Sequence, residues 1–188
     1  MQERSKILTL SNSGGKELVF TLRKCDRNDI EDILNTQETV LNSLDSQHVF
    51  VRTSAEDILE SLDVDVLIGA YCGDKPAGFT LMVTNRVTWR NLGSYLDYDD
   101  DMLRSSATYD TTFVLPEYRG YGLQAQFAEL KDEAARSMGA IEALATVAPE
   151  NTVSLKNSLE HGFELVATMP VYGGLTRCML RKKLTENK

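Results

Sequence analysis

The chain alternates short apolar runs with polar turns, and the spacing of the apolar positions predicts both strands and helices. Apolar residues recur at helical spacing after Asp26, after Ser54, from Leu123 to Met138, and over residues 152–161. The order of these elements predicts an α/β chain with a mixed sheet flanked by helices. Strand-like runs occupy residues 17–24, 64–71, 77–83, 108–115, 141–147, 163–169 and 175–180.

Capping and turn residues mark the ends of these elements. Asp26-x-x-Asp29 and Ser54-x-x-Asp57 place a side-chain acceptor ahead of a helical amide. Gly139 follows the 123–138 pattern at a position where glycine commonly ends a helix. Residues 85–107 are polar and acidic, so we predict a long loop there with a helical turn near Met102–Ser105.

Length and composition predict one globular domain. The chain has 188 residues, of which 42% are hydrophobic and 26% charged. That is an ordinary composition with enough length for one core. We expect residues 1–16 to be a flexible N-terminal tail and residues 17–188 to form a single domain. We see no signal peptide and no run of the ~20 apolar residues that a membrane helix needs.

Charge and cysteine usage narrow the environment. Lys plus Arg number 20 and Asp plus Glu number 28, giving a formal net charge of −8. Non-specific nucleic-acid binding needs a basic surface, so we expect no nucleic-acid partner, whereas a cationic substrate would be tolerated. The three cysteines are far apart and have no Cys-x-x-Cys spacing, which predicts reduced thiols and a cytoplasmic location. They are Cys25, Cys72 and Cys178.

Residues 113–124 carry the strongest chemical signal. An apolar run reaches Pro116, turns through Arg119-Gly120-Tyr121-Gly122, and becomes a helix. The first amides of a helix have no carbonyl partner within it, and the helix dipole adds partial positive charge there. Glycines permit close approach of a ligand, and arginine offers a fork of donors to phosphate. The pattern indicates capture of an anion such as a pyrophosphate, the alternative being an ordinary strand–turn–helix corner.

Three features in sequence resemble the GNAT N-acetyltransferase superfamily. Its signature, Arg/Gln-x-x-Gly-x-Gly/Ala, reads Arg119-Gly120-Tyr121-Gly122-Leu123-Gln124 here. Asn151 and Gly162-Phe163 follow at the expected distances, and the hairpin at Gly78-Phe79 also fits. The resemblance covers about residues 64–184. It implies the GNAT fold: a central, mixed, mostly antiparallel sheet flanked by helices, with acyl-CoA in the cleft where the central strands splay.

The resemblance implies acetyl-CoA, or another acyl-CoA, as the acyl donor, and it implies no metal. The pyrophosphate would lie on the amides of residues 119–124, and the pantetheine arm along the strand edge at 113–115. Asn151 would bond the pantetheine amides, although Asn is also a strong helix N-cap, and the two roles are compatible. The implied cofactor-binding residues are Phe113, Val114, Leu115, Arg119, Gly120, Tyr121, Gly122, Leu123, Gln124 and Asn151.

Two positions depart from the superfamily pattern. Gln124 stands where Gly or Ala is usual, in the first turn of the helix, where its side chain can point away from the ligand. Ser158 stands where many members have the Tyr that is often assigned as the general acid. A serine hydroxyl is a much weaker acid than a phenol, so that role does not transfer.

The catalytic candidates are Asp110 and Tyr172. Acidic residues at the strand position of Asp110 often act as the general base in this superfamily, directly or through water. Its plain alternative is a carboxylate paired with a cation, and Glu150 is a second candidate base. Tyr172 beside Gly173-Gly174 could act as the acid, the alternative being packing. Water could also protonate the leaving thiolate, because a thiol has a pKa of roughly 8.5.

The sequence therefore predicts transfer of an acetyl group to a primary amine by direct attack in a ternary complex. The alternatives are a GNAT-like module that binds CoA without turnover and a nucleotide-binding enzyme, although no Gly-Lys-Ser/Thr is present. The acceptor would be a small-molecule or peptide amine, held by residues of about 41–62 and 85–106. We expect no membrane partner, and a homodimer is compatible with the sequence.

Overall fold

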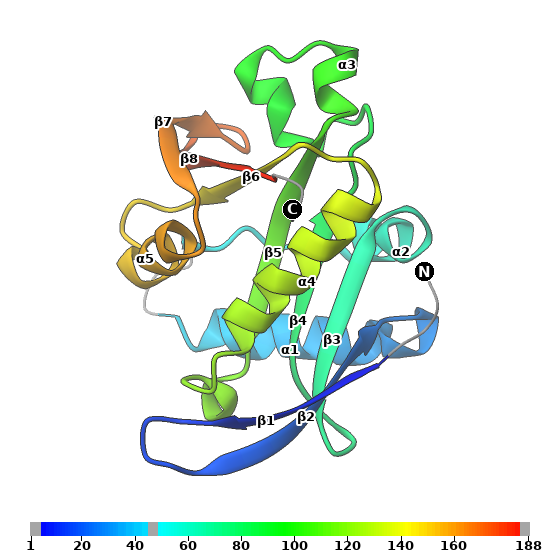
Figure 1. Cartoon of the computed structure of the whole chain (residues 1–188), viewed down its shortest axis with the longest axis vertical. Coiled ribbons are helices and arrows are strands. Elements are labelled where there is room, and N and C mark those ends of the chain that lie inside the picture. Colours follow the sequence, from blue (N-terminus) through cyan, green and yellow to red (C-terminus); the bar gives the residue numbers. More distant parts are fainter. Residues whose placement is uncertain (1–4, 45–48, 185–188) are drawn as a thin grey trace. The chain divides into compact units, whose positions relative to one another are not determined.

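The computed structural model describes residues 5–44 and 49–184. Within this part of the chain, the strands are hydrogen-bonded neighbours in the order β1-β2-β3-β4-β5-β6-β8-β7 (Figure 1). They are β1 (Lys6–Ser11), β2 (Glu17–Lys24), β3 (Val66–Cys72), β4 (Lys75–Val83), β5 (Ser106–Val114), β6 (Glu142–Val147), β7 (Glu164–Val171) and β8 (Leu175–Lys183).

The helices flank this sheet in the chain order that the sequence predicted. They are α1 (Ile30–Asn42), α2 (Ala55–Val64), α3 (Asp100–Leu103), α4 (Leu123–Ser137) and α5 (Thr152–Glu160), with 3-10 turns η1 (Arg27–Asp29), η3 (Leu92–Leu96) and η4 (Pro116–Tyr118). Neighbouring strands are antiparallel in the β1–β2, β2–β3, β6–β8 and β7–β8 pairs and parallel in the β5–β6 pair. The predicted mixed, mostly antiparallel α/β sheet is thus confirmed.

The chain divides into two compact units. The first takes the described residues of 1–45, 52–81 and 111–127, and the second takes those of 46–51, 82–110 and 128–188. Strands β4 and β5 and helix α4 each contain residues of both units. The expectation of a single domain remains a prediction.

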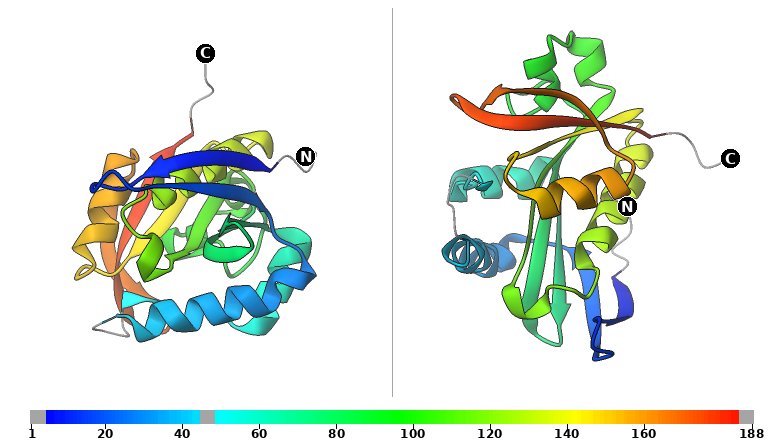
Figure 2. Two further views of the ribbon diagram at one scale, coloured as in Figure 1. Left: turned by 90° about the horizontal axis from the view of Figure 1, so that it is seen from below. Right: turned by 90° about the vertical axis from the view of Figure 1, so that its left-hand side faces the viewer.

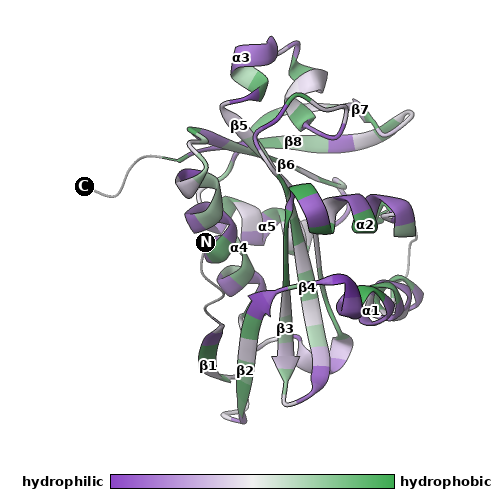
Figure 3. Ribbon diagram, turned by 90° about the vertical axis from the view of Figure 1, so that its right-hand side faces the viewer, coloured by the Kyte–Doolittle hydropathy of each residue, from purple (hydrophilic) through white to green (hydrophobic). Residues whose placement is uncertain are grey.

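The first unit is built around the apolar strand β3. Its residues Val66–Cys72 are buried at every position but the last, as expected for a central strand. Helices α1 and α2 carry apolar stripes, with Ile33 and Ile58 both 2% exposed, and Figure 3 shows the mixed hydrophilic and hydrophobic residues of these helices. Ile33, Ile58, Leu67 and Phe79 line one small pocket, so both helices pack against the strands of this unit.

The N-terminal segment corrects one prediction. Residues 6–11, expected to belong to a flexible tail, form β1 and pair antiparallel with β2, with Lys6 opposite Leu22 and Ser11 opposite Glu17 (Figure 2). Ile7, Thr9 and Ser11 are exposed while their neighbours are half-buried. This two-residue period is the pattern of a half-buried edge strand. Lys6 also donates to Gln126 Oε1 at 3.1 Å, which ties β1 to the start of α4.

The second unit has its own apolar core. Leu92, Leu144, Val171 and Met179 form a buried cluster, against which Tyr95 and other half-buried side chains pack. Leu92 comes from the segment predicted as a long loop. That segment contains the 3-10 turn η3 and the short helix α3, which overlaps the helical turn expected near Met102. The acidic residues Asp97, Asp99, Asp100 and Asp101 are exposed, and Asp99 caps α3 by accepting from Met102 N.

Other features bear on the environment of the chain. None of the helices in the described residues is long and apolar enough to cross a membrane. The cysteines are free thiols, with Cys25 and Cys178 buried. Burial raises the pKa of the Cys25 thiol, which opposes a role for this thiol as a nucleophile.

Candidate functional site

The loop between β5 and α4 has the geometry of an anion cradle within the first unit. Gly120 and Gly122 have φ values of 81° and 79°, a left-handed conformation that side-chain-bearing residues rarely adopt. A Cβ atom at either glycine would meet nothing within 4 Å, so the space above the backbone is open. The helical hydrogen bonds begin with Gln126 N donating to Gly122 O at 3.2 Å. The amides that precede Gln126 have no carbonyl partner within the helix.

Side chains around the loop fall into an exposed group and a buried group. Arg119, Gly120, Gly122 and Gln124 are exposed. The remaining predicted cofactor-binding residues of this segment are at most 9% exposed, and they are Phe113, Val114, Leu115, Tyr121 and Leu123. The buried residues hold the loop in place, and any contact with a ligand would come through their backbone.

Two contacts fix the shape of the loop. The Arg119 guanidinium donates to Ser43 Oγ at 2.9 Å, next to the end of α1. The Tyr121 ring packs edge-on against Phe20, with ring centroids 5.7 Å apart, and its hydroxyl accepts from Asn12 Nδ2 at 3.3 Å. The strand before the loop is equally constrained, because a Cβ at Gly78 would lie 2.6 Å from Phe113 O. Gly78 is thus a glycine required for close approach of the backbones.

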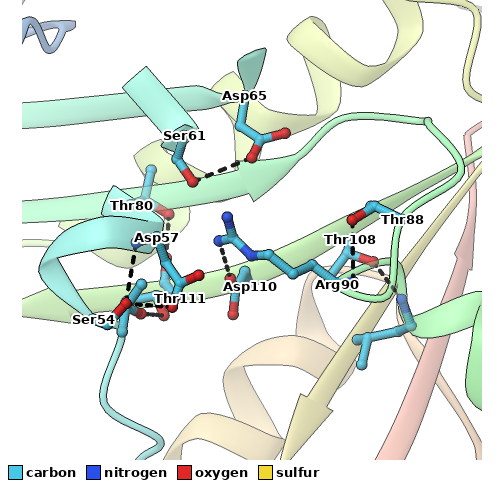
Figure 4. Close-up of polar contacts among 12 residues, drawn as sticks. Ser54, Asp57, Ser61, Asp65, Thr80, Thr88, Arg90, Thr108, Asp110 and Thr111 are labelled. Carbon is cyan, nitrogen blue, oxygen red and sulfur yellow. Dashed lines mark hydrogen bonds and ion pairs between the residues drawn. The ribbon is translucent and has the colours of Figure 1, made fainter. Parts of the chain in front are cut away.

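In the second unit, Asp110 on β5 is paired with a buried arginine. Arg90 Nη2 donates to Asp110 Oδ2 at 3.1 Å (Figure 4). The Arg90 side chain is 5% exposed and that of Asp110 is 24% exposed. The parallel pairing of β5 and β6 extends to Tyr109 opposite Ala145, and Asp110 is the next residue on β5. The next residue on β6 is Thr146.

Tyr172 reaches the same end of β6 from the turn between β7 and β8. Its hydroxyl lies 3.0 Å from Thr146 Oγ1, and its ring packs edge-on against Tyr95 at 6.3 Å between centroids. Burial, and next the charge of Asp110, raise the pKa of Tyr172 to about 12. The phenol is therefore protonated at neutral pH and can donate. Tyr172 also has φ 49°, a strained conformation for a residue with a side chain.

Comparisons with known proteins identify the fold. No protein-family model matches the sequence, and a search of curated proteins finds no match. Solved structures do match in three dimensions. YncA from Salmonella typhimurium, solved with its cofactor acetyl-CoA, is 19% identical with TM-score 0.66, covering 90% of this chain and 96% of its own. The acetyltransferase of the GNAT family from Streptococcus pneumoniae is 15% identical with TM-score 0.66, covering 87% and 98%.

The chain has the GNAT acetyltransferase fold. A third structure of this fold, the PaiA N-acetyltransferase from Thermoplasma acidophilum in complex with coenzyme A, is 14% identical with TM-score 0.62, covering 87% of this chain and 98% of its own. At such identities the likeness concerns the fold. It confirms the resemblance found in the sequence at that level.

Two further residues singled out in the sequence lie at α5, in the second unit: Asn151 directly before the helix and Ser158 within it. Asn151 caps the helix by accepting from Ser154 N at 3.1 Å, so the N-cap role predicted for it is confirmed. Its role toward pantetheine stays a prediction. Ser158 donates its hydroxyl to Ser154 O at 3.0 Å within the helix. Glu150, the second candidate base, is exposed.

Sequence reasoning missed the ionic groups of the second unit. Arg90 lies in the segment predicted as a polar loop, and no local pattern there predicts a contact with Asp110. Asp132 on α4 accepts from Tyr109 Oη at 2.5 Å and from Lys182 Nζ at 2.6 Å. Burial alone would raise the pKa of Asp132, but His161, with Nε2 3.4 Å from Asp132 Oδ2, and the hydrogen bonds from Lys182 and Tyr109 lower it below its ordinary range.

Lys131 is a further buried titratable residue on α4. It is 5% exposed, and its ammonium lies 4.8 Å from the centroid of the Tyr109 ring. Burial lowers the pKa of Lys131 to about 7, although the charges of Asp110 and Asp132 oppose the shift. Over residues 5–44 and 49–184, no cluster of three His, Cys, Asp or Glu side chains is placed to hold a metal ion.

Proposed function

We propose that the chain is an acetyl-CoA-dependent N-acetyltransferase that acts on a primary amine. The observation that carries this proposal is the loop at residues 119–124. Its two left-handed glycines face open space at the start of a long helix. Helix N-termini of this kind bind phosphate groups. The same fold holds acetyl-CoA in YncA and coenzyme A in PaiA, which supports a CoA thioester as the ligand.

The exposed residues of the loop would contact the donor. Backbone amides at Gly120 and Gly122 would receive the pyrophosphate, because no side chain blocks their approach. Arg119 would add positive charge, while its contact with Ser43 holds the guanidinium at the edge of the loop. The strand at residues 113–115 would offer backbone groups to pantetheine, with Asn151 as a further donor.

The chemistry we propose is direct attack of the amine on the thioester. The nitrogen lone pair forms the new C–N bond, the C–S bond breaks, and CoA leaves as a thiolate. The nitrogen loses one proton, for which Asp110 is the proposed acceptor, directly or through water. The thiolate gains one proton, for which Tyr172 is the proposed donor because its phenol is protonated at neutral pH.

The acceptor side of the proposal is broader. A primary amine on a small molecule or a peptide fits the net charge of −8, since an acidic protein attracts cations. The free thiols support a cytoplasmic location. A homodimer remains compatible with the sequence.

A thiol-release assay with acetyl-CoA and a panel of primary amines tests the proposal. We expect turnover on at least one amine, a loss of at least about 100-fold in kcat for Asp110→Asn, and about tenfold for Tyr172→Phe. The matched control is Ser158→Ala, which removes a hydroxyl that donates to Ser154 O within α5. It should leave kcat unchanged.

The ion pair of Asp110 and the serine at position 158 favour one second candidate, a CoA-binding module without turnover. In that case calorimetry would show acetyl-CoA binding, but no amine would release thiol. Binding of ATP in place of acetyl-CoA would contradict both proposals.

A further inference from the structure

The salt bridge between Arg90 and Asp110 is unevenly buried. Arg90 is 5% exposed, so its guanidinium has lost nearly all contact with water. A charge in this position is stable only when it is paired and hydrogen-bonded. Asp110 supplies a carboxylate oxygen at 3.1 Å and keeps 24% of its side chain exposed. The exposed partner is thus the one that a substrate can reach.

The backbone that carries Arg90 is held rigidly against the start of β5. Asn91 is fully buried, and its side-chain Nδ2 donates to Leu103 O at 3.0 Å and to Ser106 O at 3.1 Å. Leu92 N donates to Thr108 Oγ1 at 2.9 Å. Ser106 and Thr108 precede Asp110 on the same strand face, because side chains alternate along a strand. This clamp sets Arg90 opposite Asp110.

We propose that Arg90 is a positioning residue for Asp110: it keeps the carboxylate ionised and oriented, so that the ion pair sets the acid limit of acetyl transfer. This inference rests on the proposed function. It adds Arg90 to the residues of the proposed site. Arg90 lies in the segment between β4 and β5, outside the signature motif at residues 119–124.

Two other groups face Asp110. Lys131 on α4 interacts with Asp110, and with a pKa of about 7 it carries its charge in the acid range but loses it near neutrality. Tyr172, between β7 and β8, is a neutral phenol over the same range, and Arg177 on β8 interacts with that phenol. An arginine guanidinium is a permanent positive charge in proteins. The charge of Arg90 therefore acts on Asp110 throughout.

An adjacent guanidinium favours the charged form of a carboxyl group. Asp110 should then be fully ionised in the working range, ready to orient the acceptor amine and to accept the proton that its nitrogen loses, directly or through water. Removal of the Arg90 charge should raise the pKa of Asp110 and move the acid limb of kcat/KM to higher pH. A residue with a merely structural role would lower activity at all pH values equally.

Carboxyl carbon NMR titration of the unliganded protein tests the inference directly. We expect Asp110 of the wild type to titrate below the ordinary value of about 3.9. In Arg90→Gln its pKa should rise by at least about one unit, whereas Arg90→Lys should keep most of the wild-type value. The matched control is Arg136→Gln, which removes a guanidinium that pairs with Asp132. It should leave Asp110 unchanged.

Activity gives the second readout. The acid limb of kcat/KM should move upward by the same amount in Arg90→Gln and remain in place in Arg90→Lys. A wild-type Asp110 that titrates in the ordinary range, or an unshifted Asp110 in Arg90→Gln, overturns the inference. If Arg90→Gln does not fold by circular dichroism, the wild-type and Arg90→Lys titrations decide.

The two proposals fail separately. NMR titration needs no turnover, so a wild type that acetylates no amine would refute the acetyltransferase proposal and leave the pairing of Arg90 and Asp110 to be judged by the titration alone.

Discussion

Gly122 combines a left-handed backbone with open space at the start of α4. In Gly122→Glu, a carboxylate would stand where a phosphate must approach the helix amides. Two unit charges 4 Å apart repel by about 4 kcal/mol at an effective dielectric of 20, so we expect acetyl-CoA affinity to fall by at least about 100-fold. Calorimetry measures the affinity, and thermal unfolding measures the fold.

Gly15 offers a matched control for the same substitution. It lies between β1 and β2 with φ 75°, and a Cβ there would also meet nothing within 4 Å. Gly15→Glu should thus share the backbone cost of about 1 kcal/mol without touching the loop. Equal acetyl-CoA affinity in the two variants would mean that the loop at 119–124 does not bind the donor.

At the scale of the element, Asn151 is the N-cap of α5 and is also proposed to bind pantetheine. Asn151→Ala removes the N-cap of α5, which costs about 1 kcal/mol of stability. Ser54 caps α2 in the same way, accepting from Asp57 N at 3.1 Å, so Ser54→Ala is its matched control. If Asn151 also binds pantetheine, only Asn151→Ala should weaken acetyl-CoA binding, by about tenfold. Parallel calorimetry and denaturant titration separate the two effects, and equal binding in both variants would leave Asn151 as a cap only.

The elements that sequence predicted well are those with strong local signals. The capping box of Asp26 and Asp29 and the cap at Ser54 are present, and Gly139 follows the end of α4 with φ 81°. Strand β1 was missed because Ser11-Asn12-Ser13-Gly14-Gly15 resembles a flexible turn. The alternation of half-buried and exposed residues at positions 6–11 arises only when the segment pairs with β2. A short edge strand depends on its neighbour more than on its own residues.

The site residues also differ in whether a local pattern of the sequence predicts them. The glycine loop and the cap at Asn151 are local features and could be read from the sequence. The pairing of Arg90 with Asp110 and the contact of Tyr172 with Thr146 join residues 20 and 26 positions apart. Such contacts follow from the buried core of the second unit, in which Leu92 anchors the polar segment between β4 and β5. No local pattern encodes them.

Over the whole molecule, the acidic surface charge contrasts with carboxylates that are held by cations. Among the described residues, Asp29 in the first unit and Asp132 in the second are buried examples. Asp29 in the first unit accepts two hydrogen bonds from Arg23, at 2.7 and 2.8 Å, and one from Tyr71 at 2.7 Å. Asp132 plays the same part in the second unit, with Lys182 as its nearest cation. Both groups make the folded chain sensitive to acid.

Asp29 gives that sensitivity a definite pH range. Burial alone would raise the pKa of Asp29, but hydrogen bonds from Arg23 and Tyr71 lower it to about 2. In the unfolded chain an aspartate titrates at about 3.9. Because the folded value is the lower one, the stabilisation is fully present above about pH 4 and is lost as the pH falls toward 2.

Asp29→Asn should therefore lower the free energy of unfolding by about 2 to 4 kcal/mol at pH 7, and the gap to the wild type should narrow between pH 4 and 2. Denaturant titrations at several pH values measure this gap. Asp63→Asn makes the same charge change at an exposed pair with Arg27, where the side chains are 57% and 65% exposed. Surface pairs contribute little, so that control should stay within about 0.5 kcal/mol of the wild type. A constant gap for Asp29→Asn down to pH 2.5 would show that packing and the cap of η1, and not ionisation of Asp29, account for its stabilising effect.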